Sequence, residues 1–319
     1  MRKMDRCPHP NCYADDNTTC TLGHIRLEMC PEWQRVSKVD EAAPSYAEQM
    51  LLPWSGFAMG QSDQNFISGK VKPITVAIVG PESAGKTTIL GAFYLLLGQG
   101  ALTTYSHAFS NSYTLAGWEA VAICLRWKPG QPPRFPPHTP SGAARAPGML
   151  HLGFRREDGS LRDFLFADAP GEWFQKWAIN ELADDAEGAR WIARHADITL
   201  LIADRQALAG TKMGAARNDF QLLAQRAMAG ARGRRLALVW TKGDVDVAPA
   251  MEAQIRKAVA SGSSNVPEFT VSVYPRGKVD AAEGFGELFN WILGTKRSGV
   301  DLPSTDGFGH DPLFRFGRR

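Results

Sequence analysis

Short apolar runs alternate with longer stretches of helical pattern from residue 74 onwards. Runs of this length, rich in Val, Ile, Leu and Phe, indicate strands that are buried on both faces. Helical stretches between such strands are typical of a parallel sheet covered by helices. We therefore expect an α/β fold with a doubly wound, mostly parallel, six-stranded sheet. The predicted strands are residues 74–79, 149–154, 161–167, 198–203, 236–241 and 269–273.

One pair of these strands breaks the parallel pattern. Only a polar turn, residues 156–160, separates the second strand from the third, which predicts an antiparallel hairpin. Before this hairpin, residues 117–125 have a helical pattern. Residues 128–148 are dominated by Pro, Gly and Ala, which predicts a mobile loop.

Changes in composition divide the chain into four parts. Residues 1–35 are polar and Cys-rich, and residues 36–71 mix polar and apolar patches, as expected of a connector. Residues 72–295 carry the α/β pattern and form the predicted main domain. Residues 296–319 lack any period long enough for a domain, and we expect a flexible tail. With 319 residues, 44% of them hydrophobic, the chain can bury a full core.

The charge of the chain argues against nucleic acid as its main partner. The net charge is +3, and the basic residues are scattered. No stretch approaches the ~18 apolar residues of a spanning helix, and no apolar segment follows the basic residues near Met1. We expect a cytoplasmic protein without a transmembrane segment.

The strongest motif is the segment 80–87, GPESAGKT, which fits G-x-x-x-x-G-K-S/T between a predicted strand and a predicted helix. Its glycines let backbone N–H groups turn towards phosphate oxygens at a helix N-terminus. Lys86 would reach the β and γ phosphates, and the Thr87 hydroxyl would bind Mg²⁺, with Thr88 as the less favoured substitute. The predicted nucleotide-binding residues here are Gly80, Ser83, Ala84, Gly85, Lys86, Thr87 and Thr88.

A second motif, Asp168-Ala-Pro-Gly171, follows the third predicted strand and fits D-x-x-G. The Asp168 carboxylate would hold Mg²⁺ through water. The Gly171 N–H would bind the γ-phosphate and release it after hydrolysis. A plain β-turn is the alternative interpretation of these four residues.

The third motif, Thr241-Lys-Gly-Asp244, follows the fifth predicted strand. An aspartate there accepts hydrogen bonds from the ring N–H and exocyclic amine of guanine, whereas adenine offers no matching pair of donors. Lys242 would lay its alkyl stem along the base. A solvated turn is the alternative. Because all three motifs follow predicted strands, where open α/β sheets bind ligands, they favour a GTPase over an ATPase.

Together these motifs resemble those of the Ras-like and translation-factor-related class of P-loop GTPases, over residues 72–295. With a cysteine-bearing N-terminal module, the layout resembles bacterial double-GTPase proteins that are proposed to act in conflict systems. The resemblance implies a Ras-like fold, binding of GTP and GDP with Mg²⁺, and GTP hydrolysis. It also implies a protein effector or regulator, such as a second GTPase.

The chain departs from the pattern of this class at three positions. Thr241 stands where asparagine is usual, and Glu172 stands where many members place a water-orienting glutamine. The threonine that completes the Mg²⁺ shell has no unique match; Thr139 is the best-placed candidate and Ser141 the next. The resemblance assigns the catalytic roles to Lys86, Gly171 and Glu172.

Three functions are consistent with these residues. The first is a GTP-hydrolysing switch that acts through a protein partner. The second is a nucleotide-dependent scaffold without meaningful turnover, which the residues at positions 172 and 241 motivate. The third is an ATPase that uses the same phosphate-binding loop, in which Asp244 would be incidental.

Four cysteines gather in the first 30 residues, and the fifth, Cys124, stands alone. Four soft ligands in a segment with few apolar residues predict structural Zn²⁺, because the metal would supply folding energy. The spacing is not that of paired C-x-x-C ribbons, so His9 or His24 could replace one cysteine. Free cysteines are the alternative. The predicted zinc ligands are Cys7, Cys12, Cys20 and Cys30.

Overall fold

The computed structural model describes residues 29–30, 58–60, 63–69, 72–102, 106–126, 128–130, 134–136, 148–231, 234–262, 265–274 and 281–296. The chain divides into two compact units, Met1–Pro53 and Trp54–Arg319. Every helix and strand named below belongs to the second unit.

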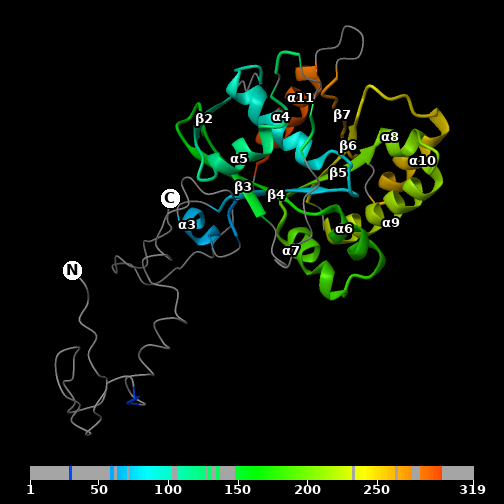
Figure 1. Ribbon diagram of the computed structural model, residues 1–319, viewed down its shortest axis with the longest axis horizontal. Helices are drawn as coiled ribbons and strands as arrows, with labels where there is room; N and C mark the ends of the chain where they lie inside the picture. The colour runs from blue at the N-terminus through cyan, green and yellow to red at the C-terminus, as the bar shows by residue number, and fades with distance from the viewer. Residues whose placement is uncertain are drawn as a thin grey trace, which may run out of the picture. The chain divides into compact units, whose positions relative to one another are not determined.

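The described residues of this unit form a seven-stranded sheet with the order β2-β3-β4-β1-β5-β6-β7 (Figure 1). Four neighbouring pairs, from β4 through β1, β5 and β6 to β7, are parallel, and β2, β3 and β4 pair antiparallel. The mostly parallel α/β fold is therefore confirmed. The strands are β1 (Ile74–Val79), β2 (His107–Asn111), β3 (Gly148–Arg156), β4 (Leu161–Asp168), β5 (Ile198–Asp204), β6 (Arg235–Thr241) and β7 (Glu268–Thr270).

The predicted count of six strands is wrong, because β2 was missed. This strand lies at the edge of the sheet, and four of its five residues are exposed. An exposed edge strand needs no apolar run, so the sequence HAFSN carried no signal for it. The last predicted strand, 269–273, is also too long at its C-terminal end, since β7 ends at Thr270.

The predicted hairpin between β3 and β4 is confirmed by an antiparallel register from Gly148↔Asp168 to Arg155↔Leu161. Its turn is closed by the Arg156 N–H, which donates to the carbonyl oxygen of Ser160 at 2.9 Å. Asp158 Oδ1 accepts from the Ser160 N–H at 2.9 Å. A polar turn of this kind joins the two strands over a short distance.

Helices cover both faces of the sheet (Figure 1). Alternate residues of β1 face opposite sides: Ala77 and Val79 join one buried cluster, and Val76 and Ile78 the other. The first cluster includes α6, α7, α9 and α10, and the second includes α4, α5 and α11. The helices are α3 (Gln64–Ser68), α4 (Lys86–Gly98), α5 (Leu115–Ala122), α6 (Gly171–Ile179), α7 (Glu187–His195), α8 (Arg205–Ala209), α9 (Met213–Ala231), α10 (Pro249–Ala260) and α11 (Ala281–Leu293), with a short 3₁₀ turn, η2 (Asp184–Ala186).

Helix α5 confirms the helical pattern predicted for residues 117–125 as far as Ala122, where the helix ends. Most of the predicted loop 128–148 lies outside the described residues. Within the predicted connector, Met59 is buried, and its N–H donates to the Met149 carbonyl oxygen at 2.8 Å. None of the helices in the described part of the chain combines the length and the apolar character needed to cross a bilayer.

Candidate functional site

The loop between β1 and α4 forms a cradle at the carboxyl end of the sheet. Helix α4 begins at Lys86, directly after Gly85, which has a φ of 85°. Ser83 also has a positive φ, 58°. Left-handed residues in such a loop turn successive backbone N–H groups towards one side, where an anion can accept from them. The positive end of the α4 dipole lies at the same place.

Lys86 lies at the centre of this cradle and is almost fully buried. Its Nζ donates to the carbonyl oxygens of Gly80, at 3.1 Å, and Pro81, at 2.7 Å. Burial lowers the pKa of Lys86 to about 8, while the nearby charges of Asp168 and Glu82 oppose this shift. A buried ammonium is costly unless an anion compensates it, so this position favours a bound phosphate group.

Asp168, at the end of β4, lies beside Thr87. The Thr87 Oγ1 donates to the two carboxylate oxygens of Asp168 at 3.3 and 3.4 Å, which are weak contacts. Burial raises the pKa of the Asp168 carboxyl, and the charge of Lys86 and the bond from Thr87 lower it. Because β4 pairs with β1, a carboxylate and a hydroxyl meet beside the buried Lys86.

Gly171, the first residue of α6, packs against the backbone of Pro81 and Glu82, near the start of the cradle. A Cβ at this position would lie 2.2 Å from the backbone nitrogen of Glu82 and 2.5 Å from the carbonyl carbon of Pro81. Only glycine fits so close to another backbone. Glu172 follows it and is half-buried.

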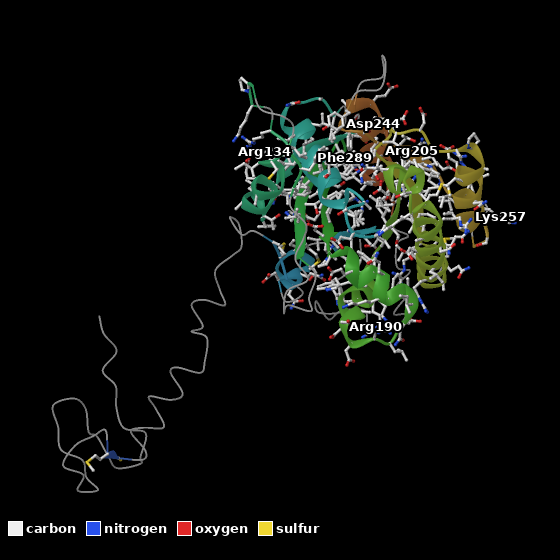
Figure 2. All side chains as sticks on the ribbon, turned by 45° about the vertical axis from the view of Figure 1, so that its right-hand side comes forward. Arg134, Arg190, Arg205, Asp244, Lys257 and Phe289 are labelled. Atoms are coloured by element: carbon white, nitrogen blue, oxygen red, sulfur yellow. The ribbon has the colours of Figure 1, made fainter. Side chains whose placement is uncertain are left out.

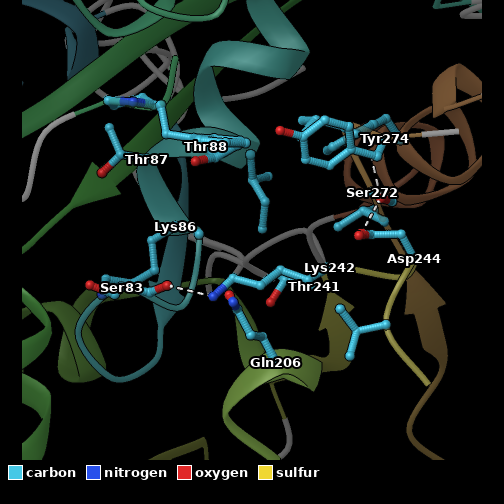
Figure 3. A pocket seen from close by; sticks show the side chains of 18 of the residues that line it. Ser83, Lys86, Thr87, Thr88, Gln206, Thr241, Lys242, Asp244, Ser272 and Tyr274 are labelled. Carbon is cyan, nitrogen blue, oxygen red and sulfur yellow. Dashed lines mark hydrogen bonds between the residues drawn. The ribbon is translucent and has the colours of Figure 1, made fainter. Parts of the chain in front are cut away.

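The Thr241-to-Asp244 segment lies on the other side of the cradle. Thr241 is buried, and its Oγ1 donates to the Ala203 carbonyl oxygen at 3.4 Å. Lys242 Nζ donates to Ser83 O at 3.2 Å, as Figure 3 shows, and forms an ion pair with Asp204 Oδ2 at 2.7 Å. Lys242 therefore connects this segment to the cradle and to the end of β5.

Asp244 is exposed and is held by the chain that follows β7. The Ser272 Oγ donates to Asp244 Oδ1 at 2.7 Å, and this Ser272 Oγ in turn accepts from the Tyr274 N–H at 3.2 Å (Figure 3). The Tyr274 ring stands edge-on to that of Phe135, with centroids 6.0 Å apart. One oxygen of the Asp244 carboxylate is thus fixed in direction.

Many of these groups line one cavity of about 500 Å³, which we name the nucleotide cavity. The predicted residues among its lining are Ser83, Gly85, Lys86, Thr87, Thr88, Gly171, Thr241, Lys242 and Asp244. Four other predicted residues, Gly80, Ala84, Asp168 and Glu172, are not part of its lining. Thr139 lies outside the described residues.

Sequence reasoning missed several residues of this site. Asp204 pairs with Lys242, and Phe135, Gln206, Ser272 and Tyr274 line the nucleotide cavity. A signal existed for Asp204, because it directly follows the predicted strand 198–203, whereas Ser272 was predicted to lie inside the strand 269–273. No local signal marked Phe135, which comes from the segment predicted as a loop.

The structure describes one of the four predicted zinc ligands. Cys7, Cys12 and Cys20 lie outside the described residues. Cys30 is buried and is not in a disulfide. Within the described ranges, no group of three or more His, Cys, Asp or Glu side chains could hold a metal ion.

Similarity to known proteins identifies the family of this chain. Among solved structures, the chain is similar to Era in a complex with MgGDPNP and nucleotides 1506–1542 of 16S ribosomal RNA, at 18% identity and a TM-score of 0.34. That match covers 73% of this chain and 60% of the Era chain. No curated protein matches.

A family model described as Double-GTPase 2 matches residues 74–292, from the start of β1 to the last turn of α11. The matched range holds the cradle, the Asp168-to-Gly171 segment and the Thr241-to-Asp244 segment. The match covers more than half of the chain and confirms the predicted class, so the protein is a P-loop GTPase that belongs to the Double-GTPase 2 family.

Proposed function

We propose that the protein binds GTP with Mg²⁺, hydrolyses GTP, and reports the bound nucleotide to a protein partner. The observation that carries this proposal is the nucleotide cavity, in which the phosphate cradle and Asp244 line the same space of about 500 Å³. A cavity of this size is in the range of small-molecule sites. Lys86 stands at one side of it and Asp244 at the other (Figure 3).

Asp244 is the residue that would select guanine. Its carboxylate can accept from the ring N–H and the exocyclic amine of guanine, and an adenine would leave it without donors. The bond from Ser272 fixes the direction of the carboxylate before the base arrives. Lys242, fixed by Asp204, would cover the base with its alkyl stem.

The phosphate end of the site supports a role for Mg²⁺. Thr87 and Asp168 offer a hydroxyl and a carboxylate, the hard oxygen donors that this ion prefers, a short distance apart. They would hold the ion, which supplies charge neutralisation at the phosphate oxygens. Lys86 and the cradle N–H groups would bind the same phosphates. Thr139 remains our proposed third Mg²⁺ ligand, on the sequence argument alone.

Hydrolysis would then depend on positioning more than on covalent chemistry. Gly171 is the first residue of α6, and its N–H would donate to the γ-phosphate. Glu172 would orient the attacking water. Loss of the γ-phosphate would release Gly171, so α6 is the element that would report the nucleotide state to a partner. The name of the family, Double-GTPase 2, is the support for a second GTPase as that partner. On the sequence resemblance alone, we also propose a role in bacterial conflict, in the cytoplasm.

A second candidate is a scaffold that binds GTP without meaningful turnover. One observation favours it: Glu172 does not line the nucleotide cavity. A single-turnover assay with purified protein separates the two functions. A measurable first-order decay of bound GTP supports the switch, and GTP that persists intact, with and without a partner, supports the scaffold.

The substitution Asp244→Asn tests base selection directly. We expect wild type to prefer GTP over ATP and over xanthosine triphosphate in competition against a labelled nucleotide. The variant should prefer xanthosine triphosphate, because an amide can donate to its extra carbonyl. Asp246→Asn, which removes an exposed charge two residues away, is the matched control and should not change the preference. ATP as the best competitor for wild type would contradict the GTPase proposal and favour the ATPase.

We also propose that Cys7, Cys12, Cys20 and Cys30 hold one structural Zn²⁺, with His9 or His24 as possible replacements for one cysteine. The support is the sequence: four thiolates within 30 residues can bind zinc tetrahedrally. This module would dock to proteins, since its acidic and basic residues balance.

A further inference from the structure

A second cavity, of about 480 Å³, lies away from the nucleotide cavity. It is formed by α6, α7, α9 and the chain just before β6. Figure 2 shows Arg190, one of its residues, at the end of the domain opposite to Asp244. We name it the arginine cavity, and its charged and aromatic lining consists of Trp177, Glu181, Arg190, Arg194, Arg226 and Arg234.

The charge of the arginine cavity is strongly positive. Four guanidinium groups face one carboxylate, and only Arg226 pairs with that carboxylate, at 2.8 Å from Glu181 Oε2. Arg194 is exposed and has no hydrogen-bond or ion-pair partner among the described residues. The lining therefore carries three positive charges that no described carboxylate balances.

Two of these arginines are held in place by backbone carbonyl groups. The Arg190 guanidinium donates to the carbonyl oxygens of Glu181, at 2.6 Å, and Ala183, at 2.7 Å. The Arg234 guanidinium donates to those of Ala193, at 3.1 Å, and Ala196, at 2.8 Å. Each guanidinium has five N–H donors, so others remain for a ligand. Groups fixed in this way bind an anion with little loss of side-chain entropy.

Trp177 adds an independent observation. This side chain is 3% exposed, and its Nε1 is buried without a hydrogen-bond partner. A buried N–H without an acceptor is unfavourable, so such groups are rare in native proteins. Trp177 Nε1 and the unpaired Arg194 guanidinium are both donors, and they call for a ligand rich in acceptor oxygens.

Helix α6 connects the two cavities. It contributes Gly171, at its first residue, to the nucleotide cavity and Trp177 to the arginine cavity. A ligand that accepts from Trp177 would therefore act on the helix whose first residue touches the cradle. Ligands at two such sites affect each other's affinity by the same factor.

We propose that the arginine cavity binds a small molecule that bears phosphate groups, and that α6 couples this binding to the nucleotide state. Phosphate groups match the planar fork of arginine. A cavity of about 480 Å³ with the buried Trp177 in its wall suits a small ligand better than a protein surface. The coupling rests on the proposed GTPase switch, whereas the anion site does not.

Titration with inorganic pyrophosphate tests the anion site. The full-length protein is first saturated with GDP, so that the nucleotide cavity is filled. We expect saturable binding with one site per chain, weakened at least about tenfold by Arg194→Ala and severalfold by Trp177→Phe, which keeps an aromatic ring and removes the N–H. Arg194 is exposed, so its variant remains informative if Trp177→Phe fails to fold. Arg217→Ala, on α9 but outside the arginine cavity, removes the same charge and should have no effect.

Several outcomes would overturn this proposal. The proposal is wrong if wild type shows no saturable binding of pyrophosphate. It is also wrong if Arg194→Ala and Arg217→Ala weaken binding equally, because equal weakening indicates general charge attraction. Saturable binding of a glutamate-rich peptide, with none of pyrophosphate, would assign the cavity to a protein segment instead.

A separate measurement tests the coupling between the arginine cavity and the nucleotide cavity. Pyrophosphate affinity should differ at least about threefold between protein loaded with GDP and protein loaded with a non-hydrolysable GTP analogue. Equal affinities would overturn the coupling. A protein that takes up no guanine nucleotide contradicts the proposed function, but the comparison of wild type with Arg194→Ala still decides the anion site.

Discussion

A single methyl group added at Gly171 would lie 2.2 Å from the backbone nitrogen of Glu82, and no side-chain motion can relieve that overlap. We predict that Gly171→Ala separates α6 from the cradle and slows GTP hydrolysis by at least about tenfold, while GDP binding stays within about threefold of wild type. Single-turnover hydrolysis and labelled-GDP titration measure the two effects.

The control for this variant is Gly214→Ala, in α9, where a Cβ would meet no atom within 4 Å. It should leave hydrolysis unchanged and stability equal or slightly higher, because alanine suits a helix better than glycine. Hydrolysis by Gly171→Ala at the wild-type rate would show that contact between α6 and the cradle is not needed.

Ser272 holds Asp244 through one hydrogen bond. Ser272→Ala removes the 2.7 Å hydrogen bond to Asp244 and should weaken GDP binding by roughly two- to tenfold, as the loss of about 0.5–1.5 kcal/mol implies. Labelled-GDP titration measures the change. Ser261→Ala, which removes a bond to the Ala258 carbonyl oxygen on α10, should bind GDP as wild type does. Equal effects of the two substitutions would contradict the role of Ser272 in holding Asp244.

At the scale of elements, α4 joins the cradle to the core. Phe93 of α4 is fully buried, and its ring lies 4.8 Å from that of Phe289 and 6.0 Å from that of Phe285, both in α11. We predict that Phe93→Ala lowers the free energy of unfolding by about 3–5 kcal/mol, because it leaves a cavity between the helices and the sheet. Chemical denaturation measures this loss.

Ile123→Ala, at the C-cap of α5, is the control for Phe93→Ala. Ile123 is 57% exposed, so its truncation should change the free energy of unfolding by less than about 0.5 kcal/mol. A loss of similar size in both variants would mean that the aromatic contacts of α4 do not anchor it.

At the scale of the whole molecule, the proposed zinc and the nucleotide belong to different units. Cys7, Cys12, Cys20 and Cys30 lie within Met1–Pro53, and the nucleotide cavity is formed by Trp54–Arg319. We predict one zinc per chain by elemental analysis. Its removal by a strong chelator, followed by return of the protein to Mg²⁺ buffer, should leave GDP affinity within about twofold of wild type, because every described residue that lines the nucleotide cavity belongs to Trp54–Arg319.

Two serine variants distinguish the proposed ligands from the remaining cysteine. Cys20→Ser should lower the zinc content, and Cys124→Ser, which changes a cysteine outside the first 35 residues, should not. Full zinc content in Cys20→Ser would exclude Cys20 as a ligand and favour His9 or His24 in its place.

The sequence by itself determined the class of the domain and the position of the cradle. Both depend on local pattern: apolar runs mark buried strands such as β1, and glycine spacing with Lys86 marks a loop that binds phosphate. It did not reveal β2, because an exposed edge strand has no apolar run to mark it. The limits of β7 were also wrong, since side-chain pattern does not show where pairing with β6 stops.

Only the tertiary structure decided which side chains meet. The strand order β4-β1-β5-β6-β7 brings Asp204 to Lys242, Ser272 to Asp244 and Gly171 to Glu82. The arginine cavity likewise gathers residues from α6, α7 and α9 that are distant in sequence. Contacts of this kind depend on how helices and strands pack, which no local pattern encodes, so the sequence predicted the motifs of the site but not the partners that fix their geometry.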